Sequence, residues 1–175
     1  MRLFLCGFMG AGKTKVGRLV AAKLGWPFVD LDQEIESSSG RKVAEIFAES
    51  GESGFRQLET AALEATAELE NGVIALGGGA FAVAENREIV GRLGLSLWLD
   101  VEFPLILRRM TPEHRLKRPL FRDESAARAL YERRLPSYRF ADLHLRIDSE
   151  APAEEVAARI VSTLEEGSSA LSRPF

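Results

Sequence analysis

Residues 7–14 spell Gly-Phe-Met-Gly-Ala-Gly-Lys-Thr, which fits the pattern G-x-x-x-x-G-K-[ST] of a loop that binds nucleotide phosphates. Glycines in such a loop allow the backbone angles that point several N–H groups toward the phosphates. Lys13 supplies a positive charge for the β- and γ-phosphates, and the hydroxyl of Thr14 suits Mg²⁺. The apolar run before the loop and the helical pattern after it favour this interpretation over a glycine-rich turn with an incidental lysine.

Acidic residues and glycines follow two further predicted strands. Asp30 and Asp32 lie at the end of an apolar stretch at 28–31, and three consecutive glycines at 77–79 follow another at 73–76. Ligands of open parallel sheets bind at the carboxyl ends of the strands, so we expect both groups to face the phosphate loop. Glycines there favour close approach of the backbone to a ligand, although a flexible turn is an alternative. Asp30 or Asp32 alternatively caps the next helix.

Arginines supply the cationic candidates. Between residues 108 and 139 there are ten Lys or Arg against four Asp or Glu, which indicates either a solvated helix face or an anion-binding site. Spacing alone does not distinguish Arg134 from its arginine neighbours. Arg56 has Glu52 and Glu59 one helical turn away, so it either pairs with them on a solvated face or is oriented by Glu59 for binding.

The elements that position these groups alternate between strands and helices. We predict strands at 2–6, 28–31, 73–76, 95–100 and 143–147. We predict helices from the phosphate loop to residue 24 and at 33–37, 43–49, 52–69, 85–93, 104–110, 124–135 and 153–164. This pattern indicates an α/β fold of the P-loop NTPase type, a three-layer sandwich with a five-stranded parallel sheet and helices on both faces.

The same pattern predicts a single domain at residues 1–166 and a frayed tail at 167–175. Residues 111–122 are charged, contain two prolines and lack a clear period, which predicts a mobile lid.

The 175-residue chain is 46% apolar and 28% charged, which is typical of a globular protein. Its net charge of −3 argues against nucleic-acid binding. No stretch approaches the roughly 18 apolar residues of a membrane span. Cys6 is the single cysteine, so no internal disulfide can form, and we interpret it as a packing residue. We therefore expect a cytoplasmic monomer without a membrane or nucleic-acid partner.

A phosphate loop leaves kinases, GTPases and motor ATPases open. GTPases usually carry the motif N-K-x-D, which this sequence lacks, and Asp100-Val101-Glu102 is a poor match to the acidic pair of motor ATPases. The remaining polar residues suit a small acceptor held against a γ-phosphate.

Six motifs together resemble the shikimate kinase family, in order and at family spacing from Arg2 to about Leu164. These motifs are the phosphate loop at 7–14, Asp30-Leu31-Asp32, Phe55-Arg56-x-x-Glu59, Gly77-Gly78-Gly79, Arg118-Pro119-Leu120 and Arg134-x-x-x-Tyr138. The resemblance implies transfer of the ATP γ-phosphate to the 3-hydroxyl of shikimate, in the biosynthesis of chorismate and the aromatic amino acids.

For the acceptor, the resemblance implies that Asp32 binds the shikimate hydroxyls near the attacking oxygen. It implies that Arg56 and Arg134 hold the carboxylate and that Gly78 offers its backbone N–H. It also places Phe47 and Phe55 beside shikimate, although such residues are more often part of the core. The chemistry agrees, because a polyhydroxylated ring with a carboxylate requires planar cations that bind its carboxylate and a hydrogen-bond acceptor, such as a carboxylate, for its hydroxyls.

For ATP and Mg²⁺, the resemblance assigns phosphate contacts to Gly10, Ala11, Gly12, Lys13, Thr14 and Lys15. Arg118 closes over the phosphates, and with Lys13 and Asp32 it forms the predicted catalytic set. Arg109 packs against adenine, and Asp30 holds the Mg²⁺ shell with Thr14 through water.

The sequence departs from the family pattern at three places. Lys15 replaces a usual hydroxyl residue, residues 148–152 lack the basic or amide side chain often found against adenine, and residues 112–116 are not glycine-rich. The rivals are another small-molecule kinase, such as a gluconate or nucleoside kinase, and a nucleotide-binding regulator that has lost phosphoryl transfer.

Overall fold

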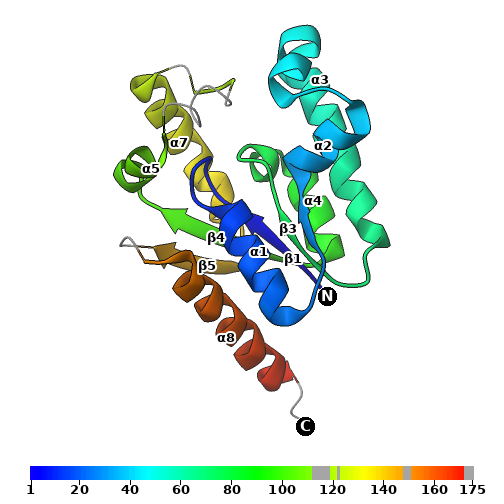
Figure 1. Cartoon of the computed structure of the whole chain (residues 1–175), viewed down its shortest axis with the longest axis vertical. Coiled ribbons are helices and arrows are strands. Elements are labelled where there is room, and N and C mark those ends of the chain that lie inside the picture. The colour runs from blue at the N-terminus through cyan, green and yellow to red at the C-terminus, as the bar shows by residue number, and fades with distance from the viewer. Residues whose placement is uncertain (112–118, 122, 148–150, 172–175) are drawn as a thin grey trace.

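The structure is a computed structural model of the chain, and it describes residues 1–111, 119–121, 123–147 and 151–171. Its centre is a five-stranded sheet in the order β2-β3-β1-β4-β5, with parallel pairing throughout (Figure 1). The strands are β1 (Arg2–Cys6), β2 (Phe28–Asp30), β3 (Gly72–Ala75), β4 (Leu95–Val101) and β5 (Leu143–Ile147). The predicted α/β fold with five parallel strands is confirmed.

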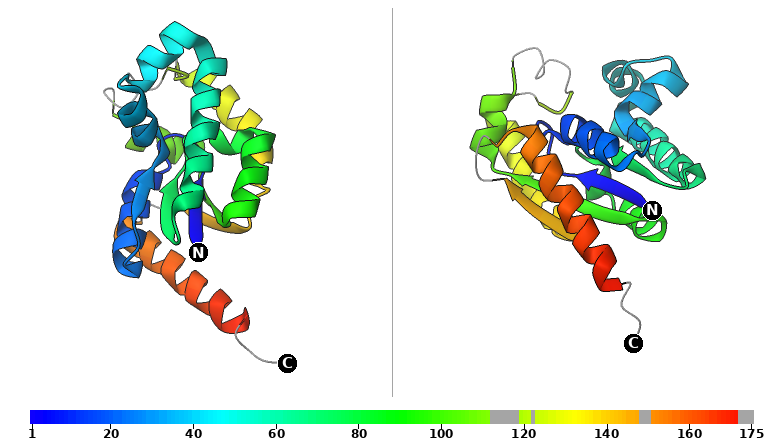
Figure 2. Two further views of the ribbon diagram at one scale, coloured as in Figure 1. Left: turned by 90° about the vertical axis from the view of Figure 1, so that its right-hand side faces the viewer. Right: turned by 60° about the horizontal axis from the view of Figure 1, so that its bottom comes forward.

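Helices cover both faces of the sheet and extend beyond one of its edges. They are α1 (Lys13–Leu24), α2 (Leu31–Ser39), α3 (Val43–Ala65), α4 (Ala84–Leu93), α5 (Phe103–Arg109), α7 (Glu124–Tyr138) and α8 (Ala153–Leu171), with short 3₁₀ turns η1 (Thr66–Glu68) and η2 (Ala80–Ala82). Figure 2 shows α1 and α8 on one face and α4 and α7 on the other. Helix α2 and the first part of α3 rise above the carboxyl edge of the sheet (Figure 1).

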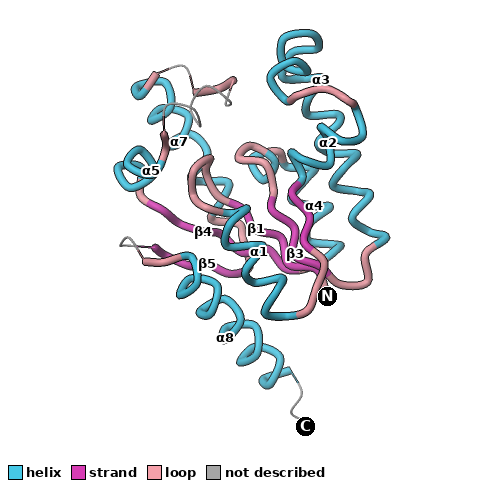
Figure 3. Tube along the Cα trace, in the orientation of Figure 1, coloured by secondary structure: helices cyan, strands magenta, loops and turns pink. Residues whose placement is uncertain are grey.

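The core is built around β1, the middle strand. Leu3, Phe4, Leu5 and Cys6 are fully buried, as expected for a parallel strand that is covered on both faces. The loops after β1 and β3 lie side by side at the carboxyl edge (Figure 3), because these two strands are neighbours in register. The sheet order therefore brings the phosphate loop next to the three glycines.

Several predicted boundaries need correction. Strand β2 ends at Asp30, one residue early, and its residues are half-buried because β2 is an edge strand rather than a central one. The separation predicted between helices 43–49 and 52–69 is confirmed by a kink of α3 at Gly51, where φ is 67° and ψ is −176°, but the second part of α3 ends at Ala65, four residues before its predicted end. Helices α7 and α8 run to Tyr138 and Leu171, three and seven residues beyond their predicted ends.

Most of the predicted lid, residues 112–118 and 122, lies outside the described residues, and its mobility stays a prediction. Of the tail predicted as frayed at 167–175, residues 167–171 belong to α8 instead, and residues 172–175 lie outside the described part. In the part of the chain that the structure describes, none of the helices combines the length and apolar character that crossing a membrane requires.

Candidate active site

The phosphate loop connects β1 to α1 and has the backbone conformation that its sequence predicts. Gly10 and Gly12 adopt positive φ angles of 79° and 93°, which L side chains rarely adopt. Helix α1 starts at Lys13, and among the described residues no side chain caps its N-terminus. The first N–H groups of α1 and the positive end of its dipole therefore suit an anion held by the loop.

Lys13 is folded back onto this loop. Its Nζ donates hydrogen bonds to the carbonyl oxygens of Gly7 at 2.8 Å and Phe8 at 3.0 Å, and only 8% of the residue is exposed. The ammonium group is thus held at the mouth of the loop, where it can exchange a carbonyl partner for a phosphate oxygen.

Thr14 and Asp30 place a hydroxyl oxygen and a carboxylate next to each other beside the loop. The Thr14 hydroxyl donates to Asp30 Oδ2 at 2.6 Å, and Asp30 Oδ1 accepts from the backbone N–H of Gln33 at 3.3 Å. Asp30 is therefore the N-cap of α2, which confirms the predicted capping role for Asp30, whereas the alternative that Asp32 caps this helix is wrong.

Hydroxyl and carboxylate oxygens are the ligands that Mg²⁺ prefers, so the Thr14–Asp30 pair fits the predicted metal site. Across the described ranges, no group of three or more His, Cys, Asp or Glu side chains could hold a metal by itself. A Mg²⁺ ion held by Thr14 and Asp30 would take the rest of its shell from phosphate oxygens and water.

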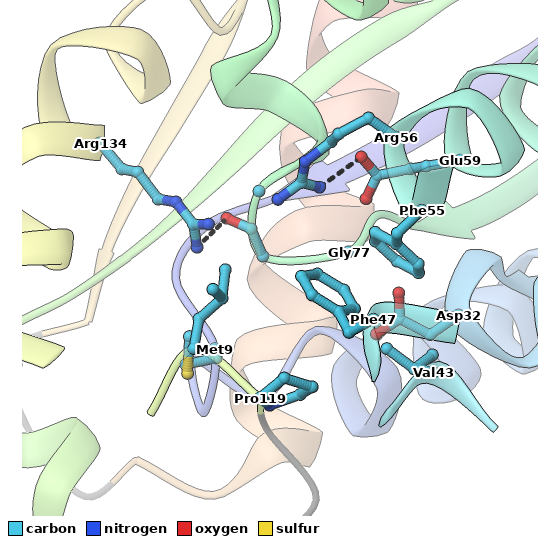
Figure 4. A pocket seen from close by; sticks show the side chains of 13 residues that line it. Met9, Asp32, Val43, Phe47, Phe55, Arg56, Glu59, Gly77, Pro119 and Arg134 are labelled. Atoms are coloured by element: carbon cyan, nitrogen blue, oxygen red, sulfur yellow. Dashed lines mark hydrogen bonds and ion pairs between the residues drawn. The ribbon is translucent and has the colours of Figure 1, made fainter. Parts of the chain in front are cut away.

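A pocket lies next to the phosphate loop (Figure 4). It is lined by Met9, Asp32, Val43, Phe47, Phe55, Arg56, Glu59, Gly77, Gly78, Gly79, Pro119, Leu120 and Arg134. The structure thus brings together all four residues predicted to bind the substrate, from the loop after β3 and from α2, α3 and α7. We call this the acceptor pocket.

Arg56 reaches the acceptor pocket from α3 with a carboxylate on either side. Its Nη1 donates to Glu59 Oε2 at 2.5 Å and its Nη2 to Glu52 Oε1 at 3.0 Å. Burial lowers the pKa of Arg56, but Glu59 and Glu52 outweigh this effect, so the pKa is raised. Both ion pairs that the sequence allowed are present, but the Arg56 side chain is only 18% exposed and does not lie on a solvated face.

Glu59 is fully buried behind Arg56. Burial raises its pKa, and the charge of Arg56 offsets part of that rise. Its Oε1 atom has no hydrogen-bond partner among the described residues, while Oε2 holds Arg56. This geometry agrees with a residue that orients Arg56, which stays a prediction.

Arg134 is the member of the arginine cluster that reaches the acceptor pocket. It is 6% exposed, whereas Arg128, Arg133 and Arg139 lie on the surface. Its Nη1 donates to the carbonyl oxygen of Gly78 at 3.1 Å, and burial lowers its pKa. Tertiary packing thus makes the selection that spacing along the sequence does not.

The two guanidinium groups converge at Gly79. A Cβ atom added to Gly79 would lie 2.3 Å from Arg56 Nη2 and 2.8 Å from Arg134 Nη2. Figure 4 shows the two arginines reaching this turn from opposite directions. Two planar cations around one point suit a carboxylate, which accepts paired hydrogen bonds.

Asp32 and an aromatic wall form the rest of the acceptor pocket. Asp32 lies in the first turn of α2, and its Oδ1 would be 2.8 Å from a Cβ atom at Gly77. The rings of Phe47 and Phe55 pack with centroids 4.7 Å apart, and both line the pocket. The pocket therefore offers cations, a carboxylate and an apolar wall to a small ring.

A second pocket lies on the other side of the loop. It is lined by Ala11, Gly12, Lys15, Val16, Arg109, Ile147, Ala151, Pro152, Ala153 and Val156. Arg109 comes from the last turn of α5, and the pocket-lining residues around the start of α8 are apolar: Ala151, Pro152, Ala153 and Val156. This arrangement suits a nucleotide base against Arg109, while residues 148–150 lie outside the described part.

The two pockets meet at the phosphate loop. Phe8 accepts the hydrogen bond from Lys13 through its carbonyl, and its ring lies 5.9 Å from the guanidinium carbon of Arg134. Lys13 and Arg134 therefore face the same edge of the sheet, as phosphoryl transfer between the two pockets requires. Arg118, predicted to close over the phosphates, lies outside the described residues.

Sequence reasoning gave no role to two pocket-lining residues, Met9 and Val43, or to Tyr138, which stands behind the pocket. Tyr138 is buried, and its hydroxyl donates to the Gly78 carbonyl at 2.5 Å. Its spacing of four residues from Arg134 in the motif is the signal that could have identified it, but the helix predicted at 124–135 ended before Tyr138, whereas α7 continues to it.

Comparisons with known proteins agree with this geometry. Residues 9–165 match the profile of a family described as "SKI: Shikimate kinase". The chain is 42% identical to a shikimate kinase of Synechococcus elongatus over 165 residues, which cover 93% of this chain and 85% of that protein. It is also 42% identical to a shikimate kinase of Symbiobacterium thermophilum over 170 residues, which cover 95% and 97%.

Solved structures show the same similarity. A shikimate kinase from Acinetobacter baumannii in complex with shikimate is 36% identical with a TM-score of 0.88, over 95% of this chain and 93% of that one. A gluconokinase from Sinorhizobium meliloti is 20% identical with a TM-score of 0.64, over 98% and 97%, and shares the fold.

Proposed function

This chain belongs to the shikimate kinase family, and we propose that it transfers the γ-phosphate of ATP to the 3-hydroxyl of shikimate, giving shikimate 3-phosphate and ADP. The reaction belongs to the biosynthesis of chorismate and the aromatic amino acids. The observation that carries the assignment is the convergence of Arg56 and Arg134 on Gly79, in the pocket that contains Asp32 and borders the phosphate loop.

Shikimate binding follows from the polarity of the acceptor pocket. The guanidinium groups of Arg56 and Arg134 bind the carboxylate, and their partial burial strengthens these charge-assisted hydrogen bonds. Asp32 accepts hydrogen bonds from the ring hydroxyls, and the Gly78 N–H donates to the substrate. The ring packs against the aromatic wall formed by Phe47 and Phe55.

ATP binds on the other side of the loop. The backbone of Gly10, Ala11 and Gly12, the start of α1 and the side chains of Lys13 and Lys15 hold the phosphates. Arg109 packs against the base, which otherwise lies among apolar side chains. Thr14 and Asp30 hold the Mg²⁺ of Mg-ATP, which offsets charge on the phosphate oxygens.

In the transfer step, the 3-hydroxyl oxygen forms a bond to the γ-phosphorus, and the bond to the oxygen that bridges to the β-phosphate breaks. The proton of the hydroxyl passes to Asp32, and ADP leaves with the electron pair of the broken bond. Because the transition state is loose and highly charged, alignment and the cations Lys13 and Arg118 contribute more than base strength. The lid predicted at residues 111–122 would exclude water that could otherwise accept the phosphoryl group.

A coupled assay of ADP release tests the proposal. With Mg-ATP present, we expect shikimate to stimulate ADP release strongly, while gluconate and nucleosides do not. Equal ADP release with and without shikimate would contradict the assignment, and stimulation by gluconate would favour the weaker alternative of a gluconate kinase. The monomeric state, the cytoplasmic location and the absence of a nucleic-acid or membrane partner stay predictions.

A further inference from the structure

We infer that Tyr138 is a positioning residue for the acceptor carboxylate, because its buried hydroxyl keeps the Gly78 carbonyl hydrogen-bonded while Arg134 turns to the substrate. The inference rests on the proposed function and adds a residue to it. Tyr138 lines neither pocket, so its contribution acts through the glycine turn and Arg134.

Two donors from one face of α7 share the carbonyl oxygen of Gly78. The Tyr138 hydroxyl donates to it at 2.5 Å and Arg134 Nη1 at 3.1 Å, so both of its lone pairs are engaged. The residues are four positions apart, which places their side chains together on the helix. The turn next to the acceptor pocket is thus held from α7 by a neutral and a charged donor.

The ring of Tyr138 is fixed from behind by the sheet. Its centroid lies 5.9 Å from that of Trp98 on β4, and the residue is 1% exposed. Burial also raises the pKa of the hydroxyl well above its usual range, so it remains a protonated donor at neutral pH. The position of the Gly78 carbonyl is therefore determined by the sheet through Tyr138.

The hydrogen bond from Tyr138 to Gly78 matters because two acceptors compete for Arg134: the Gly78 carbonyl and the substrate carboxylate. When a substrate carboxylate binds along the edge of Arg134 that carries both Nη atoms, it competes with the Gly78 carbonyl for Nη1, and the bond from Nη1 to Gly78 weakens. With Tyr138 in place, the half-buried carbonyl keeps a hydrogen bond during this exchange. Without the hydroxyl, the carbonyl depends on Arg134 and competes with the substrate for it, since an unpaired polar group away from water is costly.

The same bond sets the place of Gly79, the next residue. Both guanidinium groups converge there, within 2.8 Å of where a Cβ atom would stand. A shift of the turn away from α7 would change the separation of Arg56 and Arg134 and hence their fit to a carboxylate.

The test replaces Tyr138 with Phe and uses Tyr131→Phe as the matched control. Tyr131 lies on the same helix, and its hydroxyl also donates to a backbone carbonyl, that of Val101 at 3.2 Å, but it does not line the acceptor pocket. Each change removes one hydroxyl and retains the ring. We expect Tyr138→Phe to raise the KM for shikimate about three- to tenfold, the factor that corresponds to one hydrogen bond, with the KM for ATP and kcat within about twofold of wild type.

A double-mutant cycle separates positioning from loss of stability. We expect Tyr138→Phe to have little further effect on shikimate affinity in an Arg134→Ala background, because Tyr138 acts through Arg134. An unchanged shikimate KM in Tyr138→Phe, an equal rise in Tyr131→Phe, or full additivity with Arg134→Ala would overturn the inference. Absence of shikimate-dependent ADP release by the wild-type protein would instead refute the proposed function on which it rests.

Discussion

Replacing Gly79 with Ala places one methyl group between the two arginines of the acceptor pocket. The added carbon would lie 2.3 Å from Arg56 Nη2 and 2.8 Å from Arg134 Nη2, whereas nonbonded heavy atoms require about 3.5 Å. The backbone tolerates the change, because Gly79 has a φ of −108° and a ψ of −13°. The guanidinium groups must therefore move apart, by roughly 1 Å for Arg56.

The expected effect on catalysis is large and the effect on folding is small. A misplacement of about 1 Å can reduce turnover on the order of a hundredfold, which corresponds to about 2.7 kcal/mol in kcat/KM for shikimate. The atoms that must move are the ends of flexible side chains, so we expect the free energy of unfolding to change by about 1 kcal/mol or less.

Gly91→Ala is the matched control. Gly91 lies within α4, and a Cβ atom there would meet nothing within 4 Å. We expect it to stabilise the protein by about 0.5–1 kcal/mol with unchanged kinetics, because alanine favours the helix.

The measurements for both variants are steady-state ADP release with varied shikimate and varied ATP, and thermal unfolding. Gly79→Ala should lower kcat/KM for shikimate while the KM for ATP stays at the wild-type value, since Gly79 does not line the nucleotide pocket. If Gly79→Ala had the same kcat/KM for shikimate as the wild type, the space between Arg56 and Arg134 would not be the carboxylate site.

Three further predictions concern Asp32, Glu59 and Thr14. Asp32→Asn should abolish turnover while leaving nucleotide affinity near wild type in a titration with a fluorescent ATP analogue, and loss of nucleotide binding would move Asp32 to the metal site. Because burial raises the pKa of Glu59, this carboxylate takes up a proton at less acidic pH than an ordinary glutamate, and its hold on Arg56 weakens as the pH falls through that raised value. The KM for shikimate should therefore rise on acidification in the wild type and change less in Glu59→Gln, and identical KM profiles in the two proteins would argue against this coupling. Thr14→Val should raise the Mg²⁺ concentration needed for half-maximal activity by about tenfold or more, with the shikimate KM retained at saturating Mg²⁺, whereas an unchanged Mg²⁺ requirement would exclude Thr14 as a ligand.

Local patterns were enough to predict the elements that carry the phosphate loop. The bounds of β1 and β5 and the end of α1 were predicted to the residue, because an apolar strand, a glycine loop and a terminating glycine leave few alternatives. The end of α8 was not predicted, since residues 165–171 carry no signal strong enough to distinguish a helix from a tail.

The acceptor pocket depends on tertiary packing, and its geometry could not be derived from spacing. Arg134 differs from Arg133 only in which side of α7 it occupies, and burial of that side is decided by the sheet. The half-burial of β2 likewise follows from its place at the edge of the sheet rather than from its composition. The shared contacts of Arg134 and Tyr138 with Gly78 join segments that are distant in sequence.

A crystal structure with Mg-ADP and shikimate bound would test the central claim most directly. The account predicts that the shikimate carboxylate lies between Arg56 and Arg134 beside Gly79, with a ring hydroxyl against Asp32 and facing the phosphate loop. Shikimate bound with its carboxylate away from both arginines, or with its hydroxyls turned from Lys13, would contradict it.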